Sequence, residues 1–400
     1  MSSLSPEVSS ILSNISDVAK LLEGNKPGAR ESLISLSHKL ITTLELPSEA
    51  IQRIGWAEPA RNAHCRIGVE LGIFELLKKA GEDGASTTSL AESSRVEGPL
   101  LARILKHLSA MHVIKEKGAD TYASTPLSNA FVEPKFKDGI IYTYDVAGPS
   151  FASLPSYLKS TNYKNPTELT NGPFQHAHKT TLPFFAWLDQ NPPYLSIFNN
   201  YMAAYRAGKA NWCDPGFYPI ENLTTGFQPE EKVLLVDVGG GLGHDLVELK
   251  QKHGDKLVGE LILQDREEVI TSLSTTDGFK AMSHDFFTPQ PVLHARAYYL
   301  HSVLHDWGDE DCVRILQNLI PALKKGYSRI LINEIVVSGV EASLASTSMD
   351  QLMLILGAMK ERTEEQWRAL VGKAGLKVKA IWKYEGVAES LIEVELVDGA

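Results

Sequence analysis

Apolar and polar residues alternate with two different periods along this chain. Between residues 1 and 50, apolar side chains recur every three or four positions on both sides of the segment Asn25-Lys26-Pro27-Gly28. This spacing predicts two amphipathic helices joined by a turn. Their apolar faces need a cover, which we expect to be either a partner subunit or another part of the same chain.

The following stretch predicts a helix-turn-helix with a small two-stranded sheet, the pattern of a winged helix. Ser89 lies three residues before Glu92, an arrangement typical of a capping box at the start of a helix. A second helical pattern runs over 99–111, and short strand-like segments follow around 113–115 and 121–122.

The middle of the chain, 140–230, is rich in aromatic residues, which have two interpretations. Aromatic residues at helical spacing usually form a core. Alternatively, some of them line a flat apolar pocket for an aromatic or polyketide-like substrate. They are Phe174, Phe184, Phe185, Trp187, Tyr194, Phe198, Tyr201, Tyr205, Trp212, Phe217 and Tyr218.

From residue 231 onward, short apolar runs alternate with helical patterns. Such alternation predicts an α/β fold in which a mostly parallel sheet carries helices on both faces. The runs 376–383 and 391–397 are close enough to form a hairpin, which adds an antiparallel closing strand. We therefore expect three regions: a helical and winged-helix region over 1–140, a helical linker and substrate-pocket region over 141–230, and a catalytic region over 231–400.

Composition and charge narrow the classes of partner. The 400 residues carry a formal net charge of −10, and the stretch 81–130 has five Lys or Arg against six Asp or Glu. A winged helix that reads DNA needs a basic face, so we expect no nucleic-acid partner. The N-terminus lacks the features of a signal peptide, no long apolar run predicts a membrane span, and the three cysteines suit a reducing compartment. These features predict a soluble cytoplasmic protein.

A glycine-rich turn follows the first apolar run of the α/β region. Residues 236–245 read VDVGGGLGHD, so that Gly239, Gly241 and Gly243 stand just before a helical pattern. Glycine lets the backbone approach a ligand closely, and a helix N-terminus favours a carboxylate or phosphate. The dinucleotide fingerprint would require Gly or Ala at position 244, where this chain has His244. The turn therefore favours a nucleotide-type cofactor other than NAD.

Two further segments follow the next strand-like runs of the predicted sheet. Asp265 ends one run, where a carboxylate accepts hydrogen bonds from ribose hydroxyls, or is simply solvated. Asp285 and Phe286 follow the next run and are suited to hold an adenine, the carboxylate near its amino group and the ring against its face.

A histidine-rich segment follows the fourth strand-like run, where open α/β sheets place their ligands. Its residue His305, in LHDWGDEDC, would act as a base, because a neutral imidazole of pKa about 6.5 suits a phenol of pKa about 10. Two carboxylates are candidates to orient it: Glu334, within an apolar strand where an acid needs a partner, and Glu361. Glu361 is alternatively a surface residue that opens the helix 363–374.

Together these motifs resemble the plant- and fungal-type class I O-methyltransferases that act on small-molecule hydroxyls. The resemblance covers nearly the whole chain, since the N-terminal part is similar to the family's dimerisation domain. It implies a Rossmann-like methyltransferase sheet, S-adenosyl-L-methionine as cofactor, a hydroxylated small-molecule substrate and a homodimer formed through the N-terminal domain. The matching segments are VDVGGGLGHD at 236–245, QD at 264–265, HDFF at 284–287, LHDWGDEDC at 304–312, INEIVV at 332–337 and KERTEEQW at 360–367.

The resemblance also implies a role for each matching residue. His305 would be the base, framed by Glu334 and Glu361. The substrate ring would lie between Phe198 and Met202, with Met353 on the matching C-terminal helix. The cofactor-binding set would be Asp237, Gly239, Gly240, Gly241, Gly243, Asp265, Asp285, Phe286 and His301.

One position departs from the family pattern, and two other functions stay open. Members commonly have Lys or Arg four residues before the catalytic histidine, where this chain has His301. We see no dedicated metal cluster and expect a metal-independent mechanism. One alternative is a cyclase of secondary metabolism that binds the cofactor on this fold but catalyses a pericyclic step without methyl transfer. The other, a DNA-binding regulator, is disfavoured by the acidic wing.

Overall fold

The computed structural model describes residues 5–397 except 203, 274–275, 277 and 358. The chain forms two compact units. The first consists of Met1–Ser16, Leu36–Lys164 and Thr170–Gly208, and the second of Asp17–Ser35, Asn165–Leu169 and Lys209–Ala400. The division into 1–140, 141–230 and 231–400 stays a prediction. Within the described residues, no helix has the length and apolar character needed to cross a membrane.

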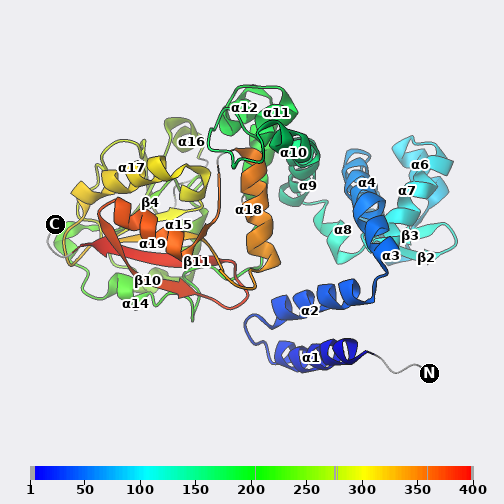
Figure 1. Cartoon of the computed structure of the whole chain (residues 1–400), viewed down its shortest axis with the longest axis horizontal. Coiled ribbons are helices and arrows are strands. Elements are labelled where there is room, and N and C mark those ends of the chain that lie inside the picture. Colours follow the sequence, from blue (N-terminus) through cyan, green and yellow to red (C-terminus); the bar gives the residue numbers. More distant parts are fainter. Residues whose placement is uncertain (1–4, 203, 274–275, 277, 358, 398–400) are drawn as a thin grey trace. The chain divides into compact units, whose positions relative to one another are not determined.

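The two helices expected at the N-terminus are present. They are α1 (Pro6–Glu23) and α2 (Ala29–Leu44), and the turn between them has positive φ angles at Asn25 and Gly28. Figure 1 shows them at the blue end of the chain.

The first unit contains the predicted winged helix. α6 and α7 precede the strands β2 and β3, and a third strand, β1, completes a sheet of order β1-β3-β2. Apolar side chains of α4, α5, α6 and α7 pack with Tyr122 of β3 in one core. The bounds are α3 Pro47–Gln52, α4 Glu58–Glu70, α5 Ile73–Ala80, β1 Ala85–Ser86, α6 Thr87–Ser94, α7 Gly98–Ala110, β2 Lys115–Gly118, β3 Thr121–Ala123 and α8 Pro126–Ala130.

The predicted capping box at the start of α6 is wrong by one turn. The helix begins at Thr87, and its cap is Ser86, whose hydroxyl accepts a hydrogen bond from the Ser89 backbone at 3.1 Å. Ser86 also ends β1, so the strand fixes where the helix begins.

Helices also make up the rest of the first unit, and aromatic rings fill the space between them. Phe174, Phe184, Trp187 and Phe198 contact one another or their neighbours edge to face. Phe174 and Phe184 are buried and belong to the core, whereas Trp187 and Phe198 are partly exposed, so their interpretation stays open. The bounds are α9 Pro134–Ile141, α10 Gly148–Ser160, α11 Pro173–His178, α12 Phe184–Gln190 and α13 Tyr194–Met202.

The second unit is built on the predicted α/β sheet. In the described part of the chain its strand order is β10-β11-β8-β7-β4-β5-β6, with β9 paired to β8. Strands β4 to β8 run parallel, and β11 and β10 close the sheet in antiparallel orientation, as expected. The bounds are β4 Val233–Val238, β5 Glu260–Asp265, β6 Lys280–Ser283, β7 Ala297–His301, β8 Arg329–Val337, β9 Arg362–Thr363, β10 Leu376–Lys383 and β11 Glu389–Leu396.

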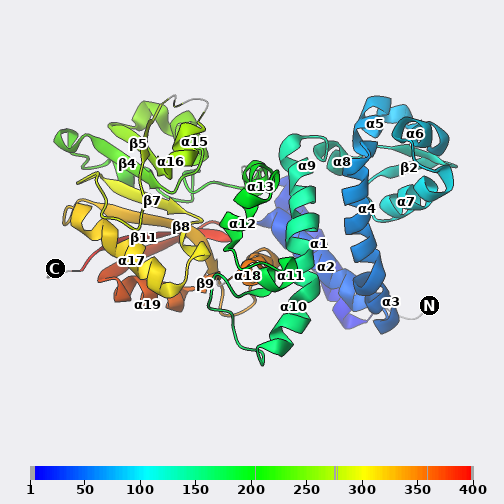
Figure 2. The same ribbon diagram turned by 90° about the horizontal axis from the view of Figure 1, so that it is seen from above.

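Helices cover both faces of this sheet (Figure 2). Because side chains alternate along a strand, Tyr298 belongs to the core under α17 and α19, and Tyr299 to the core under α15. Trp212, Phe217 and Tyr218 join the second of these cores. The helix bounds are α14 Glu221–Thr224, α15 His244–His253, α16 Glu267–Thr271, α17 Asp309–Leu319, α18 Leu344–Leu356 and α19 Glu364–Lys373.

Candidate active site

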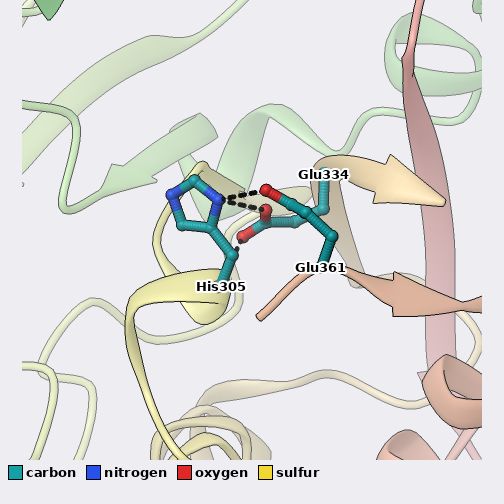
Figure 3. A group of neighbouring side chains, drawn as sticks. All are labelled: His305, Glu334 and Glu361. Atoms are coloured by element: carbon teal, nitrogen blue, oxygen red, sulfur yellow. Dashed lines mark hydrogen bonds and ion pairs between the residues drawn. The ribbon is translucent and has the colours of Figure 1, made fainter. Parts of the chain in front are cut away.

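His305 lies on a short 3-10 turn, Leu304–Asp306, that follows the carboxyl end of β7. The side chain of His305 is mostly buried, with the residue 9% exposed. Its two predicted partners converge on it from other elements, Glu334 from β8 and Glu361 from the residue before β9 (Figure 3). The structure therefore brings together three residues that are far apart in the sequence.

Glu361 makes the direct contact with the ring. The Nδ1 atom of His305 lies 2.9 Å from Glu361 Oε1, so the ring donates Nδ1–H to the carboxylate. Glu361 is 5% exposed, and its own backbone N–H donates to Asp350 Oδ1 on α18 at 3.0 Å. The interpretation of Glu361 as a surface residue is therefore wrong.

Glu334 lies beside the His305 ring but makes its hydrogen bonds to the backbone of the turn. Its Oε2 atom lies 3.7 Å from His305 Nδ1, whereas Oε1 accepts the backbone N–H groups of Val303, Leu304 and His305 at 3.0, 2.8 and 3.3 Å. One oxygen of this buried carboxylate is thereby satisfied by the backbone of the turn, while Oε2 has no hydrogen-bond partner among the described residues. Glu334 holds the turn, and Glu361 holds the ring.

The surrounding carboxylates raise the pKa of His305. Burial alone would lower this pKa, but Glu334, Asp306 and Glu361 outweigh burial and raise it from 6.5 to about 10. The three carboxylates therefore favour the imidazolium, whereas the sequence alone suggested a neutral ring of ordinary pKa. A cation bound nearby would lower the pKa again, because it disfavours the imidazolium.

The same three residues have the donor types of a metal site. Among the described residues, His305, Glu334 and Glu361 each offer one ligand atom, and these atoms lie within 4.8 Å of one another. Imidazole and carboxylate are ligands of divalent transition metals. In this structure, however, the Nδ1–H of His305 already bonds to Glu361. A metal-independent mechanism stays a prediction.

The predicted glycine turn lies at the carboxyl end of β4. Gly239, Gly241 and Gly243 all have positive φ, so the backbone curls between the strand and α15. A Cβ at Gly240 would come within 2.3 Å of Asp237 Oδ2, so a side chain at this position does not fit. Within the turn, Leu242 is the residue that carries a side chain, and it is 42% exposed.

Asp237, at the end of β4, is a buried carboxyl beneath this turn. It is 1% exposed, and neither of its oxygens has a hydrogen-bond partner among the described residues. Burial raises its pKa well above the usual range, and the charges of Asp245 and Asp265 raise it further. A buried carboxyl without a partner is suited to bind a cationic or hydrogen-donating group of a ligand.

Asp265 lies at the end of β5, next to the same turn. Its Oδ2 accepts the Gly241 N–H at 2.8 Å, and its Oδ1 accepts the Arg266 N–H at 2.7 Å. After β6, Asp285 accepts the Phe287 N–H at 2.9 Å. The Phe286 ring contacts those of Phe287 and Trp307. These residues therefore stand at the ends of neighbouring parallel strands, as predicted.

His301 is committed to partners within the protein. Its Nδ1 lies 2.5 Å from Asp245 Oδ2, which also accepts the Tyr299 hydroxyl at 2.8 Å. Its Nε2 lies 3.9 Å from Glu389 Oε1. His301 thus lies between two carboxylates, and its predicted binding of the cofactor stays a prediction.

The predicted substrate residues lie on two helices. Phe198 and Met202 stand four positions apart on α13 of the first unit, where the Phe198 ring contacts Tyr142, Phe184 and Phe185. Met353 is buried on α18 of the second unit. Their role stays a prediction.

Several residues around His305 escaped the sequence analysis. Asp306 lies on the turn beside the ring, Asp350 accepts the Glu361 backbone N–H, and Arg362 donates to the Leu304 carbonyl. Asp309 in turn binds Arg362. Asp306 and Asp309 belong to the quoted motif, but no pattern in the sequence shows which acids there make contacts within the protein. The burial of Arg362, at 1% exposed, is equally invisible in a charged stretch such as KERTEE.

Comparison with known proteins identifies the family. A model of the O-methyltransferase domain matches residues 220–377, and a model of the O-methyltransferase dimerisation domain matches residues 65–134. The O-methyltransferase mpaG' of Penicillium brevicompactum is 49% identical over 401 residues, covering 99% of this chain and 100% of that protein. This chain belongs to the O-methyltransferase family. It is an enzyme that uses S-adenosyl-L-methionine, and the resemblance deduced from its motifs is confirmed.

Solved structures place this methyltransferase on the expected class I fold with an N-terminal helical dimerisation domain. The complex of LepI with SAM has a TM-score of 0.88 at 27% sequence identity, covering 98% of this chain and 100% of that one. A structure described as a pericyclic reaction enzyme has a TM-score of 0.87 at 27% identity, covering 97% and 100%. The cofactor inferred from the sequence is thus the cofactor held by a structural relative.

Proposed function

We propose that the enzyme methylates a hydroxyl of an aromatic or polyketide-type small molecule, with His305 as general base. The observation that carries this proposal is the buried imidazole whose Nδ1 bonds to Glu361. With Nδ1 engaged, Nε2 is the nitrogen that takes the proton of the acceptor hydroxyl. The nearest carboxylate oxygen to Nε2, Asp306 Oδ1, lies 3.6 Å away.

The chemistry is an in-line displacement. When bound, S-adenosyl-L-methionine supplies an electrophilic methyl group on a sulfonium, and it leaves as S-adenosylhomocysteine. As the acceptor oxygen forms its bond to carbon, His305 Nε2 takes the hydroxyl proton. Glu361 stabilises the resulting imidazolium, and Glu334 keeps the turn in place. Base catalysis of this kind contributes about 10² to 10⁴ in rate, and positioning contributes much of the rest.

The glycine turn and its carboxylates are the proposed cofactor site. Gly239, Gly240, Gly241 and Gly243 would accept the methionine part of the cofactor, and Asp237 beneath them would meet its ammonium group. Asp265 would bind the ribose, and Asp285 with Phe286 the adenine. Two observations support this proposal. The buried Asp237 carboxyl has no hydrogen-bond partner among the described residues, and a side chain at Gly240 would clash with it.

Replacing His305 with Gln tests the base assignment. We expect His305→Gln to bind S-adenosylhomocysteine normally in calorimetry yet lose about 10²- to 10⁴-fold in kcat. His294→Gln is the matched control, because His294 is a half-exposed histidine at the other end of β7. A near-native rate for His305→Gln would show that His305 is not the base.

The acceptor class is tested with methyl-labelled cofactor and a panel of phenols and hydroxypyridones. Label in the product establishes the acceptor. The structural likeness to a pericyclic reaction enzyme makes a cyclase the second candidate. Cofactor binding with isomerised product and no label would favour that candidate. Substitution of Phe198, Met202 or Met353 by Ala should raise KM for the acceptor if they hold its ring.

The enzyme is also proposed to form a homodimer through its N-terminal region. Within the first unit, a segment just before the matched dimerisation domain exposes a row of large apolar side chains, each at least 50% accessible. A second copy of this chain would cover this row. Trp56→Glu should then shift the protein toward monomer in sedimentation, and an unchanged dimer would contradict the surface. The row is Ile41, Leu44, Leu46, Ile51, Ile54 and Trp56.

A cytoplasmic location is proposed on the state of the cysteines. Cys65, Cys213 and Cys312 are all buried and unbridged. This suits a reducing compartment. Fractionation of cells that express the tagged protein tests the proposal, and recovery with sealed organelles would overturn it.

A further inference from the structure

Arg362 is almost fully buried beside the turn that carries His305. It is 1% exposed, although arginine is rarely buried completely without partners. Arg362 follows Glu361 in the sequence, and strand β9 pairs it with Val336 of β8. The sheet therefore fixes the backbone position of Arg362.

The guanidinium binds the backbone on both sides of His305. Nη1 donates to the Leu304 carbonyl at 3.0 Å, and Nη2 donates to the Trp307 carbonyl at 2.9 Å. Nε and Nη2 also donate to Asp309 Oδ1 at 3.1 and 2.9 Å. The planar guanidinium thus joins Leu304, just before the histidine, to Trp307, two residues after it, and to Asp309 at the start of α17.

Three successive residues hold this turn together. The Lys360 N–H donates to the His305 carbonyl at 3.2 Å, Glu361 accepts from the ring, and Arg362 binds the flanking carbonyls. Lys360 Nζ also reaches Asp309 Oδ2 at 2.9 Å. The ring and its backbone are therefore fixed by one short segment, so a shift of Arg362 moves the turn relative to Glu361.

We propose that Arg362 is a positioning residue for His305, which sets the imidazole against Glu361 by clamping both ends of its turn. This inference rests on the proposed role of His305 as base. Lysine cannot replace the clamp, because an ammonium lacks the planar fork that reaches separate acceptors in fixed directions. A misplacement of about 1 Å near reacting atoms costs about 10² in rate.

Arg362→Lys is the principal test, with Arg296→Lys as its control. Arg296 also binds backbone carbonyls, those of Asn222, Leu223, Thr225 and Tyr327, but it precedes β7 at the end of the strand away from His305. Both substitutions keep the positive charge and remove the planar guanidinium with its several N–H donors. Asp309→Asn is a milder variant, because the Asp309 side chain is 44% exposed and its loss leaves the core intact.

Three measurements separate positioning from a general loss of stability. We expect Arg362→Lys to lower kcat by about 10- to 10²-fold and leave the affinity for S-adenosylhomocysteine unchanged. In an NMR titration of the free protein, the Cε1–H signal of His305 should shift at lower pH than in the wild type, because the ring has lost contact with Glu361. Asp309→Asn should lower kcat and the pH of the His305 titration as well, but by less. Arg296→Lys should lower only Tm.

Native kcat and a native His305 titration in Arg362→Lys would overturn the proposal. So would equal effects of Arg362→Lys and Arg296→Lys on both measurements. Should Arg362→Lys fail to fold, Asp309→Asn decides, since an unchanged titration in that variant is also contrary to the proposal. If the wild type transfers no label, the proposed function fails, while the NMR titration of the free protein still decides the positioning role.

Discussion

Replacing Glu361 with Gln separates the shape of this residue from its charge. The amide oxygen can still accept Nδ1–H, but one of the three carboxylates that act on His305 is lost. Together these carboxylates raise the pKa of His305 from 6.5 to about 10. At 1.36 kcal/mol for each pKa unit, the net shift, after burial has been overcome, favours the imidazolium by about 5 kcal/mol. If the three carboxylates act equally, the loss of Glu361 lowers the pKa by at least about one unit.

The pH dependence of kcat reports this change directly. In the wild type, kcat should rise with pH as the imidazole loses its proton. In Glu361→Gln the rise should come about one pH unit lower, and the plateau should fall about tenfold because a weaker base has less driving force. Label transfer is measured from pH 6 to about 10, with Glu365→Gln, an exposed residue of α19, as control.

A rise that stays at the wild-type pH in Glu361→Gln would refute the reasoning, because Glu361 would then not act on the imidazole. A rise that moves to higher pH would be equally contrary, since losing a negative charge cannot favour the imidazolium. Calorimetry with S-adenosylhomocysteine shows whether the cofactor site has stayed intact.

Three further predictions concern stability and the cofactor site. Since the folded pKa of His305 lies above its unfolded value of 6.5, its stabilisation is complete below pH 6.5 and is lost as the pH rises toward 10. The Tm of the wild type should therefore fall more steeply over this range than that of His305→Gln, and parallel curves would contradict the shift. Asp237→Asn should raise the Tm of the free protein while weakening cofactor binding in calorimetry, because it removes a buried carboxyl without a partner; a lower Tm would show that the carboxyl stabilises the fold. Gly240→Ala would place a Cβ 2.6 Å from Leu263 Cδ1 and should cost about 1–3 kcal/mol in urea unfolding. Gly372→Ala, a helical position with open space, should instead stabilise by about 0.5–1 kcal/mol, and equal curves for the two would contradict the steric argument.

The linear pattern was sufficient for a mostly parallel sheet with an antiparallel closing strand. Strand β4 (Val233–Val238) is the apolar run before the glycine turn, because a fully buried parallel strand is a continuous apolar run. The N-terminal helices follow from the helical spacing of their apolar side chains, of which Val8 and Ile11 are the buried ones in α1. The cap of α6 failed because Ser86 and Ser89 are both hydroxyl residues suited to an N-cap, and the pairing of β1 with β3 selects Ser86.

The sequence by itself determined which residue types meet at the carboxyl edge of the sheet, because parallel strands bring their ends together whatever the side chains are. It named His305, Glu334 and Glu361, but it could not divide the work between the two glutamates. That division depends on the turn after β7, whose three N–H groups point at Glu334 and leave the ring to Glu361. The raised pKa of His305 likewise arises only in the tertiary structure, because folding brings three carboxylates to the ring. The burial of Arg362 also depends on elements that only folding brings together.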